Sequence, residues 1–147
     1  MRRAVRFLVL LGVCFLAACQ TPESVKTASE VASKPQVMYR VSYAGQQIYA
    51  GHWYNLNVDC SINNIPEGTI LKPPAHGVAQ FKVIEDYSNY SSTNLRSPCN
   101  KQKSKSLALF YTPEKGYTGD DSVLVKVVSP PTMFGQWNYQ IRVEPAR

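Results

Sequence analysis

Residues 110–122, Phe-Tyr-Thr-Pro-Glu-Lys-Gly-Tyr-Thr-Gly-Asp-Asp-Ser, are the stretch that decides the fold. An apolar run ends at Pro113, and proline is a poor residue for the middle of a sheet. Gly116 and Gly119 permit backbone angles that other residues resist, and Asp121 is expected to cap its own turn. The stretch therefore predicts the end of one strand, a tight connection closed by Tyr117, and the start of the next strand.

On both sides of this stretch the side chains alternate between apolar and polar with a period of two. This pattern is typical of strands that have one dry and one wet face. It is clearest at residues 137–144 and recurs at residues 37–43, 54–58 and 80–83, where we expect the apolar rows to face the core. Residues 107–111 and 123–128 are apolar on both faces, which predicts central strands.

Turn-forming residues separate these runs, at Gly45 and at residues 63–64, 66–68, 73–74, 76–77, 115–116, 119–120 and 130–131. About seven strands over roughly 110 residues, with turns between them, are typical of an all-β sandwich. The folded part contains no pattern for a long helix and no internal repeat.

Two segments resemble the bacterial immunoglobulin-like (Ig-like) modules of the cadherin-like type, which occur in envelope and surface proteins. They are residues 74–78, Pro-Ala-His-Gly-Val, and the stretch 110–122. The resemblance covers roughly residues 73–128 and implies an Ig-like antiparallel β-sandwich over residues 37–147. Three features depart from the family pattern: the module is single, Trp53 precedes Cys60 instead of lying between the two cysteines, and residues 85–106 form an apparent insertion.

The N-terminus has the features of an export signal. Arg2, Arg3 and Arg6 precede an apolar run over residues 7–16, which is about half the ~20 residues that a membrane span needs. Residues 16–19, Leu-Ala-Ala-Cys, resemble the bacterial lipobox, which implies cleavage after residue 18 and lipidation of Cys19. Gln20, in place of aspartate, points to the outer membrane under the family's sorting rule. We expect a signal peptide over residues 1–18 and a lipidated, flexible tether over residues 19–36.

Composition limits the possible functions. Loss of residues 1–18 removes three arginines and no acidic residue, so the formal net charge falls from +6 to +3. This mild charge on an exported chain gives no reason to expect a nucleic-acid partner. Cys60 and Cys99 are then the remaining cysteine pair, and a disulfide between them would close a loop of about 40 residues. Their wide spacing argues against a redox-active or metal-binding pair.

The sequence shows no catalytic constellation, and we expect neither an enzyme nor a cofactor. The two histidines, His52 and His76, are far apart, and no Gly-x-Ser-x-Gly motif is present. The adjacent acids at residues 85–86 and 120–121 would face opposite sides of a strand. Weak calcium binding at Asp120-Asp121 is an alternative to a capped turn, but a single module lacks the junction that holds calcium in tandem modules. We therefore expect no metal site.

The segment from Glu85 to Ser106 is the candidate binding loop. It combines tyrosines with cationic side chains, a composition suited to recognition: Tyr87, Tyr90, Arg96, Lys101, Lys103 and Lys105. The alternative is a solvated loop whose lysines prevent edge pairing between sheets.

These observations predict a lipid-anchored protein of the bacterial outer membrane, facing the periplasm, that acts as a non-catalytic interaction module. Its partner would be another envelope protein, in a secretion, adhesion or envelope-assembly complex. The alternatives are a glycan- or lipopolysaccharide-binding module and an inhibitor of hydrolases. Glycan binding predicts Trp53, Tyr87 and Tyr90 exposed on one flat face, whereas a protein partner predicts an apolar strand edge or patch.

Overall fold

The computed structural model describes residues 34–131 and 133–146. Within these residues the chain forms nine strands and one short 3₁₀ helix, so the all-β prediction is confirmed with nine strands in place of about seven. The elements are β1 (Gln36–Tyr43), β2 (Ile48–Trp53), β3 (Asn55–Leu56), β4 (Ile62–Asn64), β5 (Glu67–Lys72), β6 (Gly77–Tyr87), η1 (Ser97–Lys101), β7 (Lys103–Pro113), β8 (Gly119–Ser129) and β9 (Met133–Glu144).

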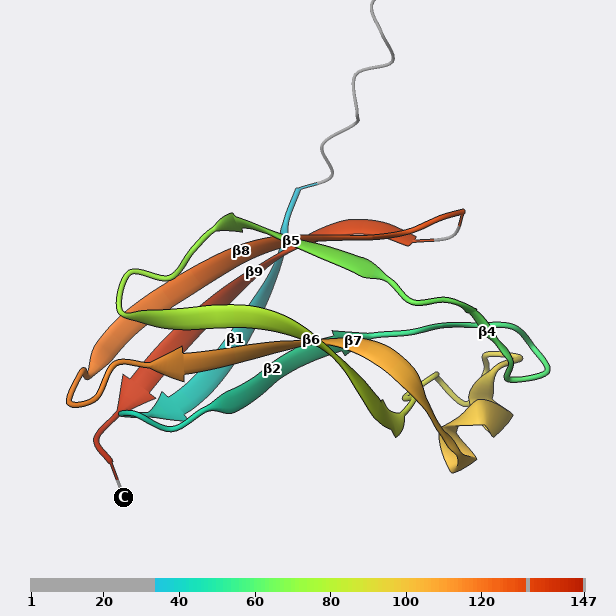
Figure 1. Ribbon diagram of the computed structural model, residues 1–147, viewed down its shortest axis with the longest axis horizontal. Coiled ribbons are helices and arrows are strands. Elements are labelled where there is room, and N and C mark those ends of the chain that lie inside the picture. Colours follow the sequence, from blue (N-terminus) through green and yellow to red (C-terminus); the bar gives the residue numbers. More distant parts are fainter. Residues whose placement is uncertain (1–33, 132, 147) are drawn as a thin grey trace, which may run out of the picture. The chain divides into compact units, whose positions relative to one another are not determined.

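Two sheets pack face to face (Figure 1). One has four strands in the order β1-β9-β8-β5, the other has three in the order β2-β7-β6, and β3 and β4 form a separate two-stranded arm. The arm and η1 lie at the end of the sandwich opposite the C-terminus (Figure 1). All pairs are antiparallel except β1 and β9, which run parallel, so the expected fully antiparallel sandwich has one exception.

The core lies between the sheets and is built by the two runs that were predicted to be central. β7 contributes its inward row of Leu107, Leu109 and Tyr111, and β8 contributes Val123, Val125 and Val127, all at most 6 % exposed. β7 is the middle strand of its sheet and β8 has a neighbour on each side, which confirms that prediction. The apolar row of β9 also faces inwards, as its alternation predicts.

Asp121 joins the two segments that carry the Ig-like resemblance. Its Oδ1 accepts hydrogen bonds from the backbone N–H groups of Ala75 at 2.9 Å and Ser122 at 2.8 Å. Its Oδ2 accepts from the N–H of His76 at 3.0 Å and the hydroxyl of Tyr111 at 2.8 Å. Asp121 therefore caps the turn of residues 74–77 rather than only its own turn, and it ties that turn to β7 and β8.

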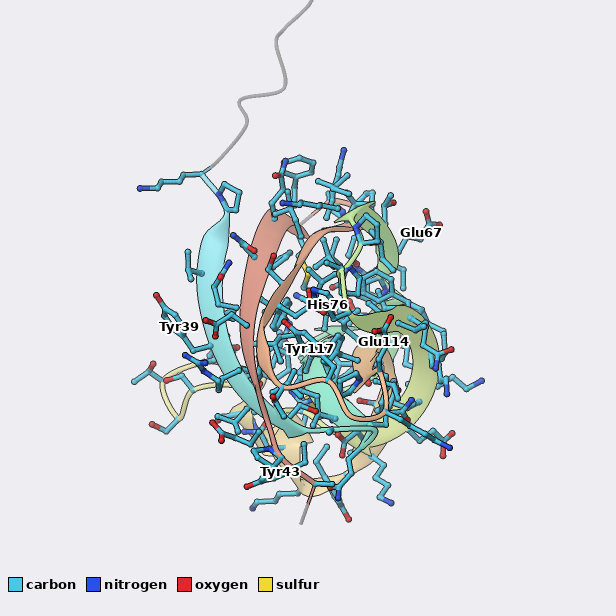
Figure 2. The ribbon with its side chains drawn as sticks, turned by 90° about the vertical axis from the view of Figure 1, so that its left-hand side faces the viewer. Tyr39, Tyr43, Glu67, His76, Glu114 and Tyr117 are labelled. Carbon is cyan, nitrogen blue, oxygen red and sulfur yellow. A yellow bond between two sulfur atoms is a disulfide. The ribbon has the colours of Figure 1, made fainter. Side chains whose placement is uncertain are left out.

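A stacked ring pair closes the same end of the sandwich. The rings of His76 and Tyr117 lie 4.0 Å apart with 13° between their planes, and Figure 2 shows both at this end. The hydroxyl of Tyr117 donates to the carbonyl of Asp120 at 2.7 Å. Tyr117 also packs against the core, as expected for a residue that closes the sandwich.

The predicted facing of β1 is wrong. Val37, Tyr39 and Val41 were expected to face the core, yet they are 48 %, 77 % and 57 % exposed. The inward positions are Met38, Arg40 and Ser42. The polar groups are tolerated inside because Arg40 Nε donates to the Ala50 carbonyl at 2.6 Å and the Ser42 hydroxyl donates to the Gln46 carbonyl at 3.1 Å.

The alternating strand predicted at residues 54–58 is correct only in part. Tyr54 and Leu56 are buried as expected, but Asn55 is also buried and Val58 is 55 % exposed. Asn55 Nδ2 donates to the Ser129 hydroxyl at 2.8 Å and to Asn64 Oδ1 at 3.1 Å, which fixes the β3–β4 arm to the end of β8. The chain then turns at residues 57–61, where the N–H of Asn57 donates to the carbonyl of Ser61 at 2.9 Å.

The predicted disulfide between Cys60 and Cys99 is present. It holds the β3–β4 arm against the loop that carries η1, and Cys99 forms a small second core with Tyr54 and Leu56. The expected excursion over residues 85–106 is shorter than predicted. β6 and β7 remain paired as far as Tyr87 and Lys103, which leaves only residues 88–102 as the loop.

Candidate functional site

The outward face of β1 carries an exposed apolar row, formed by Val37, Tyr39 and Val41. These side chains point away from the core, and Figure 2 shows Tyr39 projecting from the outer side of the strand. An aromatic residue that is 77 % exposed on a regular strand contributes nothing to the core. We call these three residues the β1 row.

The backbone of the same residues forms a free sheet edge. The N–H of Ala44, just after β1, donates to the carbonyl of Glu144 at 2.9 Å and so points towards β9. Because backbone groups alternate sides along a strand, the even-numbered residues of β1 face β9 and the odd-numbered ones face outwards. Consistent with this, the carbonyl of Tyr39 accepts from Arg40 Nη1 at 2.8 Å. The β1 row therefore combines exposed apolar side chains with outward-facing backbone groups, of which the Tyr39 carbonyl already accepts from Arg40.

The other sheet edges carry features that discourage pairing. β5 has a register shift between Ile70 and Lys72 and is followed by Pro73 and Pro74. β2 has a register shift between Tyr49 and Gly51.

Two edges remain, those of β6 and β1. β6 carries charged side chains at Lys82, Glu85 and Asp86. β1 pairs with β9 over eight residues without a register shift, and its single charged residue, Arg40, points inwards. Among the described edges, β1 is thus the one best suited to accept a strand.

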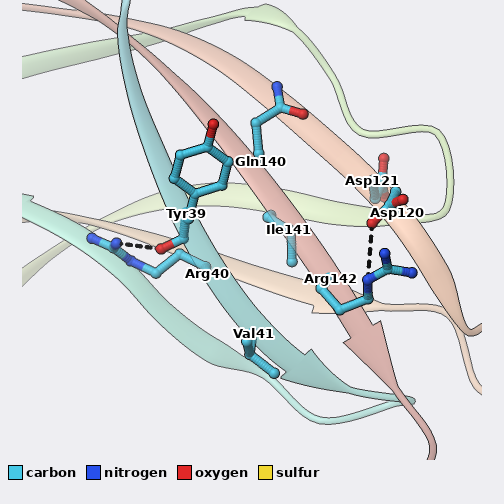
Figure 3. Close-up of a pocket in the computed structure, with 8 residues that line it drawn as sticks. All are labelled: Tyr39, Arg40, Val41, Asp120, Asp121, Gln140, Ile141 and Arg142. Atoms are coloured by element: carbon cyan, nitrogen blue, oxygen red, sulfur yellow. Dashed lines mark hydrogen bonds and ion pairs between the residues drawn. The ribbon is translucent and has the colours of Figure 1, made fainter.

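A depression of about 500 Å³ borders the β1 row on the outer face of the four-stranded sheet (Figure 3). Tyr39 and Val41 line one side, and Gln140 and Arg142 of β9 lie beside them. Arg142 Nε pairs with Asp120 Oδ1 at 3.1 Å, but both side chains are more than half exposed, so this ion pair adds little stability. The face offers apolar contact at β1 and hydrogen-bonding groups next to it.

Four of the six residues of the candidate binding loop are exposed, namely Tyr87, Lys101, Lys103 and Lys105. Tyr87 and Lys103 are a cross-strand pair in the β6–β7 ladder, with the Lys103 ammonium 5.7 Å from the Tyr87 ring centre. Lys101 and Lys105 are exposed, and Lys105 pairs across the strands with Glu85.

The remaining two residues of that loop have structural partners. Arg96 Nε donates to the carbonyl of Leu56 at 2.5 Å, which ties the loop to the β3–β4 arm. Tyr90 packs against the disulfide core, with its ring centre 6.1 Å from that of Tyr54. Tyr90 is thus partly buried and Trp53 is only 6 % exposed, so Tyr87 is the one exposed residue of the three aromatic residues named for glycan binding.

A polar cluster on the outer face of the three-stranded sheet was not expected from the sequence. His52 on β2 is hydrogen bonded at Nδ1 by the Tyr49 hydroxyl and at Nε2 by the Tyr54 hydroxyl. Its Nδ1 also lies 3.6 Å from Asp86 Oδ2, and the Tyr49 hydroxyl donates to the same oxygen at 3.1 Å. The closeness in sequence of Tyr49, His52 and Tyr54 was a signal, whereas Asp86 is brought in by β6.

Burial sets the protonation of this cluster. Burial lowers the pKa of His52, and the opposing effect of the Asp86 charge is smaller. The pKa of Asp86 is lowered, chiefly by the backbone N–H of Tyr87 and also by the Tyr49 hydroxyl, against a smaller rise from burial. Burial first, and Asp86 second, raise the pKa values of both tyrosines. At neutral pH the cluster is therefore a neutral imidazole held by two hydroxyls beside a carboxylate.

The cluster does not extend to the second histidine, because His76 lies in the stacked pair with Tyr117. In the described part of the chain, no three His, Cys, Asp or Glu side chains are arranged to hold a metal ion. No helix there is long and apolar enough to cross a membrane. The predicted signal peptide, Cys19 and residues 19–33 of the tether lie outside the described residues.

Comparison with known proteins identifies no family. No protein-family model matches the sequence, and no curated protein matches it. Among the solved structures to which the chain is similar is one described as the solution structure of amebosin, at 7 % identity and a TM-score of 0.37. That match covers 76 % of this chain and 100 % of the other. A similarity this low supports no conclusion about function.

Proposed function

We propose that this protein is a lipid-anchored component of the bacterial outer membrane that binds another envelope protein through the free edge of β1, without catalysis. The partner contributes a β-strand that pairs with the outward backbone groups of the β1 row. Strand addition of this kind obtains affinity from main-chain hydrogen bonds and specificity from neighbouring side chains.

Two observations support the location. The lipobox-like residues 16–19 follow a basic start and a short apolar run. The disulfide between Cys60 and Cys99 suits an oxidising compartment such as the periplasm. Lipidation at Cys19 would tether the sandwich to the membrane and leave its strand edges accessible to neighbours.

The single observation that carries the binding role is the exposure of the β1 row on a regular edge whose one charged residue, Arg40, has its side chain on the inward face. A sheet edge of this kind promotes unwanted association unless it is covered or used. The solvent-exposed edges of β5 and β6 carry lysines, proline or a register shift, whereas β1 has none of these on its outer side. We infer that the β1 edge is covered by a partner in the cell.

The test is in-cell crosslinking and capture of the tagged lipoprotein, comparing two variants of equal charge change. Tyr39→Lys with Val41→Lys places two cations on the outer side of β1. Thr69→Lys with Leu71→Lys places two cations on exposed positions of β5, the opposite edge of the same sheet. We expect one defined envelope protein to be captured by the wild type and the β5 variant and lost from the β1 variant.

A third variant separates this surface from the basic loop. Changing Lys101, Lys103 and Lys105 to serine removes the exposed cations near η1 and leaves β1 intact. Retained capture in this variant supports the β1 edge. If capture is lost here and retained in the β1 variant, the binding surface is the basic loop and the proposal for β1 is wrong.

A further inference from the structure

A cleft of about 240 Å³ opens along the side of the sandwich, between the free edges of β1 and β2. Its lining differs from the β1 row because it is aromatic and contains a cation. The chain has two tryptophans, and both line this cleft. The lining residues that matter here are Arg40, His52, Trp53, Asn89, Trp137 and Tyr139.

Arg40 brings a positive charge into the cleft without a counter-ion. Its guanidinium donates through Nε to the Ala50 carbonyl at 2.6 Å and through Nη1 to the Tyr39 carbonyl at 2.8 Å. It lies 5.4 Å from the ring centre of Tyr139. No carboxylate among the described residues pairs with it, in contrast to Arg142, which pairs with Asp120. Both of its hydrogen bonds go to neutral carbonyls, so Nη2 remains available to an anion, which it would bind by a charge-assisted bond.

Aromatic rings line the cleft beside this charge: Trp137 is partly exposed, and Trp53 and Tyr139 are largely buried behind it. The ring centres of Trp53 and Trp137 are 5.2 Å apart, and Tyr139 meets Trp53 edge-on at 6.5 Å. Gly51 is required where Tyr139 approaches β2, because a Cβ at that position would lie 2.1 Å from the tyrosine hydroxyl oxygen. Asn89 adds an amide that has no hydrogen-bond partner among the residues described, and it is exposed.

The charges around the cleft favour an anion with one negative charge. His52 is held neutral between two tyrosine hydroxyls, so it does not add to the charge of Arg40. Asp86, which lies 3.6 Å from His52, places a negative charge near the cleft and disfavours a second charge on the ligand. A monocarboxylate matches one guanidinium, and the donor of Asn89 can bind its second oxygen.

We propose that this cleft binds a small organic monocarboxylate with an apolar body, its carboxylate on Arg40 and its body against the partly exposed ring of Trp137. This ligand site lies beside the β1 edge that the proposed strand partner would use, and its test needs no protein partner. Its volume is below that of typical drug-sized sites, which run from about 300 Å³, so the ligand is small.

Tryptophan fluorescence of the full-length protein, purified in detergent, tests this proposal, because both tryptophans report on the cleft. Phenylacetate is the probe, and phenylacetamide, which has the same shape and no charge, is its control. We expect a saturable fluorescence change with phenylacetate and at least tenfold weaker binding of phenylacetamide. We expect the same tenfold loss for phenylacetate in the Arg40→Met variant.

The comparison of the two probes uses the unchanged protein, so it remains decisive even if Arg40→Met disturbs folding. An absent or non-saturable response to phenylacetate would overturn the proposal. Equal affinity for the amide would overturn it as well, since Arg40 would then play no part. Loss of partner capture at β1 has no bearing on this result, which needs no protein partner.

Discussion

Among the polar residues of the sandwich, Asp121 should be the one whose substitution lowers the unfolding free energy most. Its neighbour Asp120 provides a matched control. Asp121 is 7 % exposed and accepts four hydrogen bonds, two on each oxygen. Asp120 is exposed and forms one ion pair with Arg142. The two residues are identical in type and adjacent in sequence, so they differ only in where the strand points them.

The cost of Asp121→Asn follows from the geometry. Asparagine keeps one acceptor oxygen, so two of the four hydrogen bonds survive. If the NH₂ group takes the place of Oδ2, it faces the N–H of His76 and the Tyr111 hydroxyl. If it takes the place of Oδ1, it faces the N–H groups of Ala75 and Ser122. The hydroxyl can reverse and accept, but at least one buried N–H is left without an acceptor, which costs about 1–3 kcal/mol. With the lost charge assistance, we expect unfolding free energy to fall by about 3 kcal/mol.

The assay is urea unfolding of the disulfide-intact protein at pH 7, followed by tryptophan fluorescence. Asp120→Asn should change the unfolding free energy by less than about 0.5 kcal/mol, because an exposed ion pair contributes little. A loss below about 1 kcal/mol for Asp121→Asn would refute the reasoning, as would an equal loss for Asp120→Asn.

Asp121 also sets a pH dependence. Burial alone would raise its pKa, but the hydrogen bonds from Ala75, Tyr111, Ser122 and His76 together outweigh burial, so its pKa is lowered. A carboxyl with a lower pKa in the folded state stabilises the fold above its unfolded pKa of about 3.9. This stabilisation should be lost as pH falls below about 4, and Asp121→Asn should abolish that part of the acid unfolding.

Three further predictions concern other parts of the domain. Replacing Cys60 and Cys99 by serine should lower the unfolding free energy by about 4 kcal/mol, the loop-closure value for their separation; a loss below about 1 kcal/mol in urea unfolding would contradict it. Gly51→Ala should cost about 1–3 kcal/mol through its contact with the Tyr139 hydroxyl, and Tyr139→Phe should recover part of that loss, so a double variant as unstable as the single one argues against the contact. Burial lowers the pKa of His52, so its stabilisation is complete above about pH 6.5 and is lost as pH falls through the lowered value; His52→Gln should reduce the drop in urea midpoint between pH 7.5 and 5.5, and an unchanged drop would contradict this.

The strands with the simplest surroundings were predictable from the sequence. β9 has one face on the core and one on solvent, so its alternation gave both its position and its facing. β7 and β8 are apolar on both faces, and in the middle of their sheets even outward positions such as Ala108 and Leu124 are at most partly exposed. The disulfide was predictable because only one cysteine pair remained after the lipobox cysteine.

The errors arose where a polar side chain finds a specific inward partner. In β1, Arg40 and Ser42 point inwards because the carbonyls of Ala50 and Gln46 accept their hydrogen bonds. The alternation was therefore correct in period and reversed in facing. Asn55 is a second case, since its partner Ser129 is distant in sequence.

The same limitation hid the candidate site. An exposed apolar row and a buried one have the same pattern in the sequence, so the β1 row was assigned to the core. The basic loop was conspicuous in composition, yet two of its residues, Tyr90 and Arg96, pack against the disulfide region and the Leu56 carbonyl. The cleft beside Arg40 depends on the approach of β1 to β2, and no local pattern encodes it.

Site-specific photocrosslinking at Tyr39 tests the central claim most directly, because a benzoylphenylalanine there replaces an exposed aromatic ring with another. The control position is Leu71, an exposed apolar residue on the opposite edge of the same sheet. The account predicts that living cells yield one defined envelope-protein adduct from position 39 and none from position 71. The same adduct from both positions, or no adduct from position 39, would contradict it.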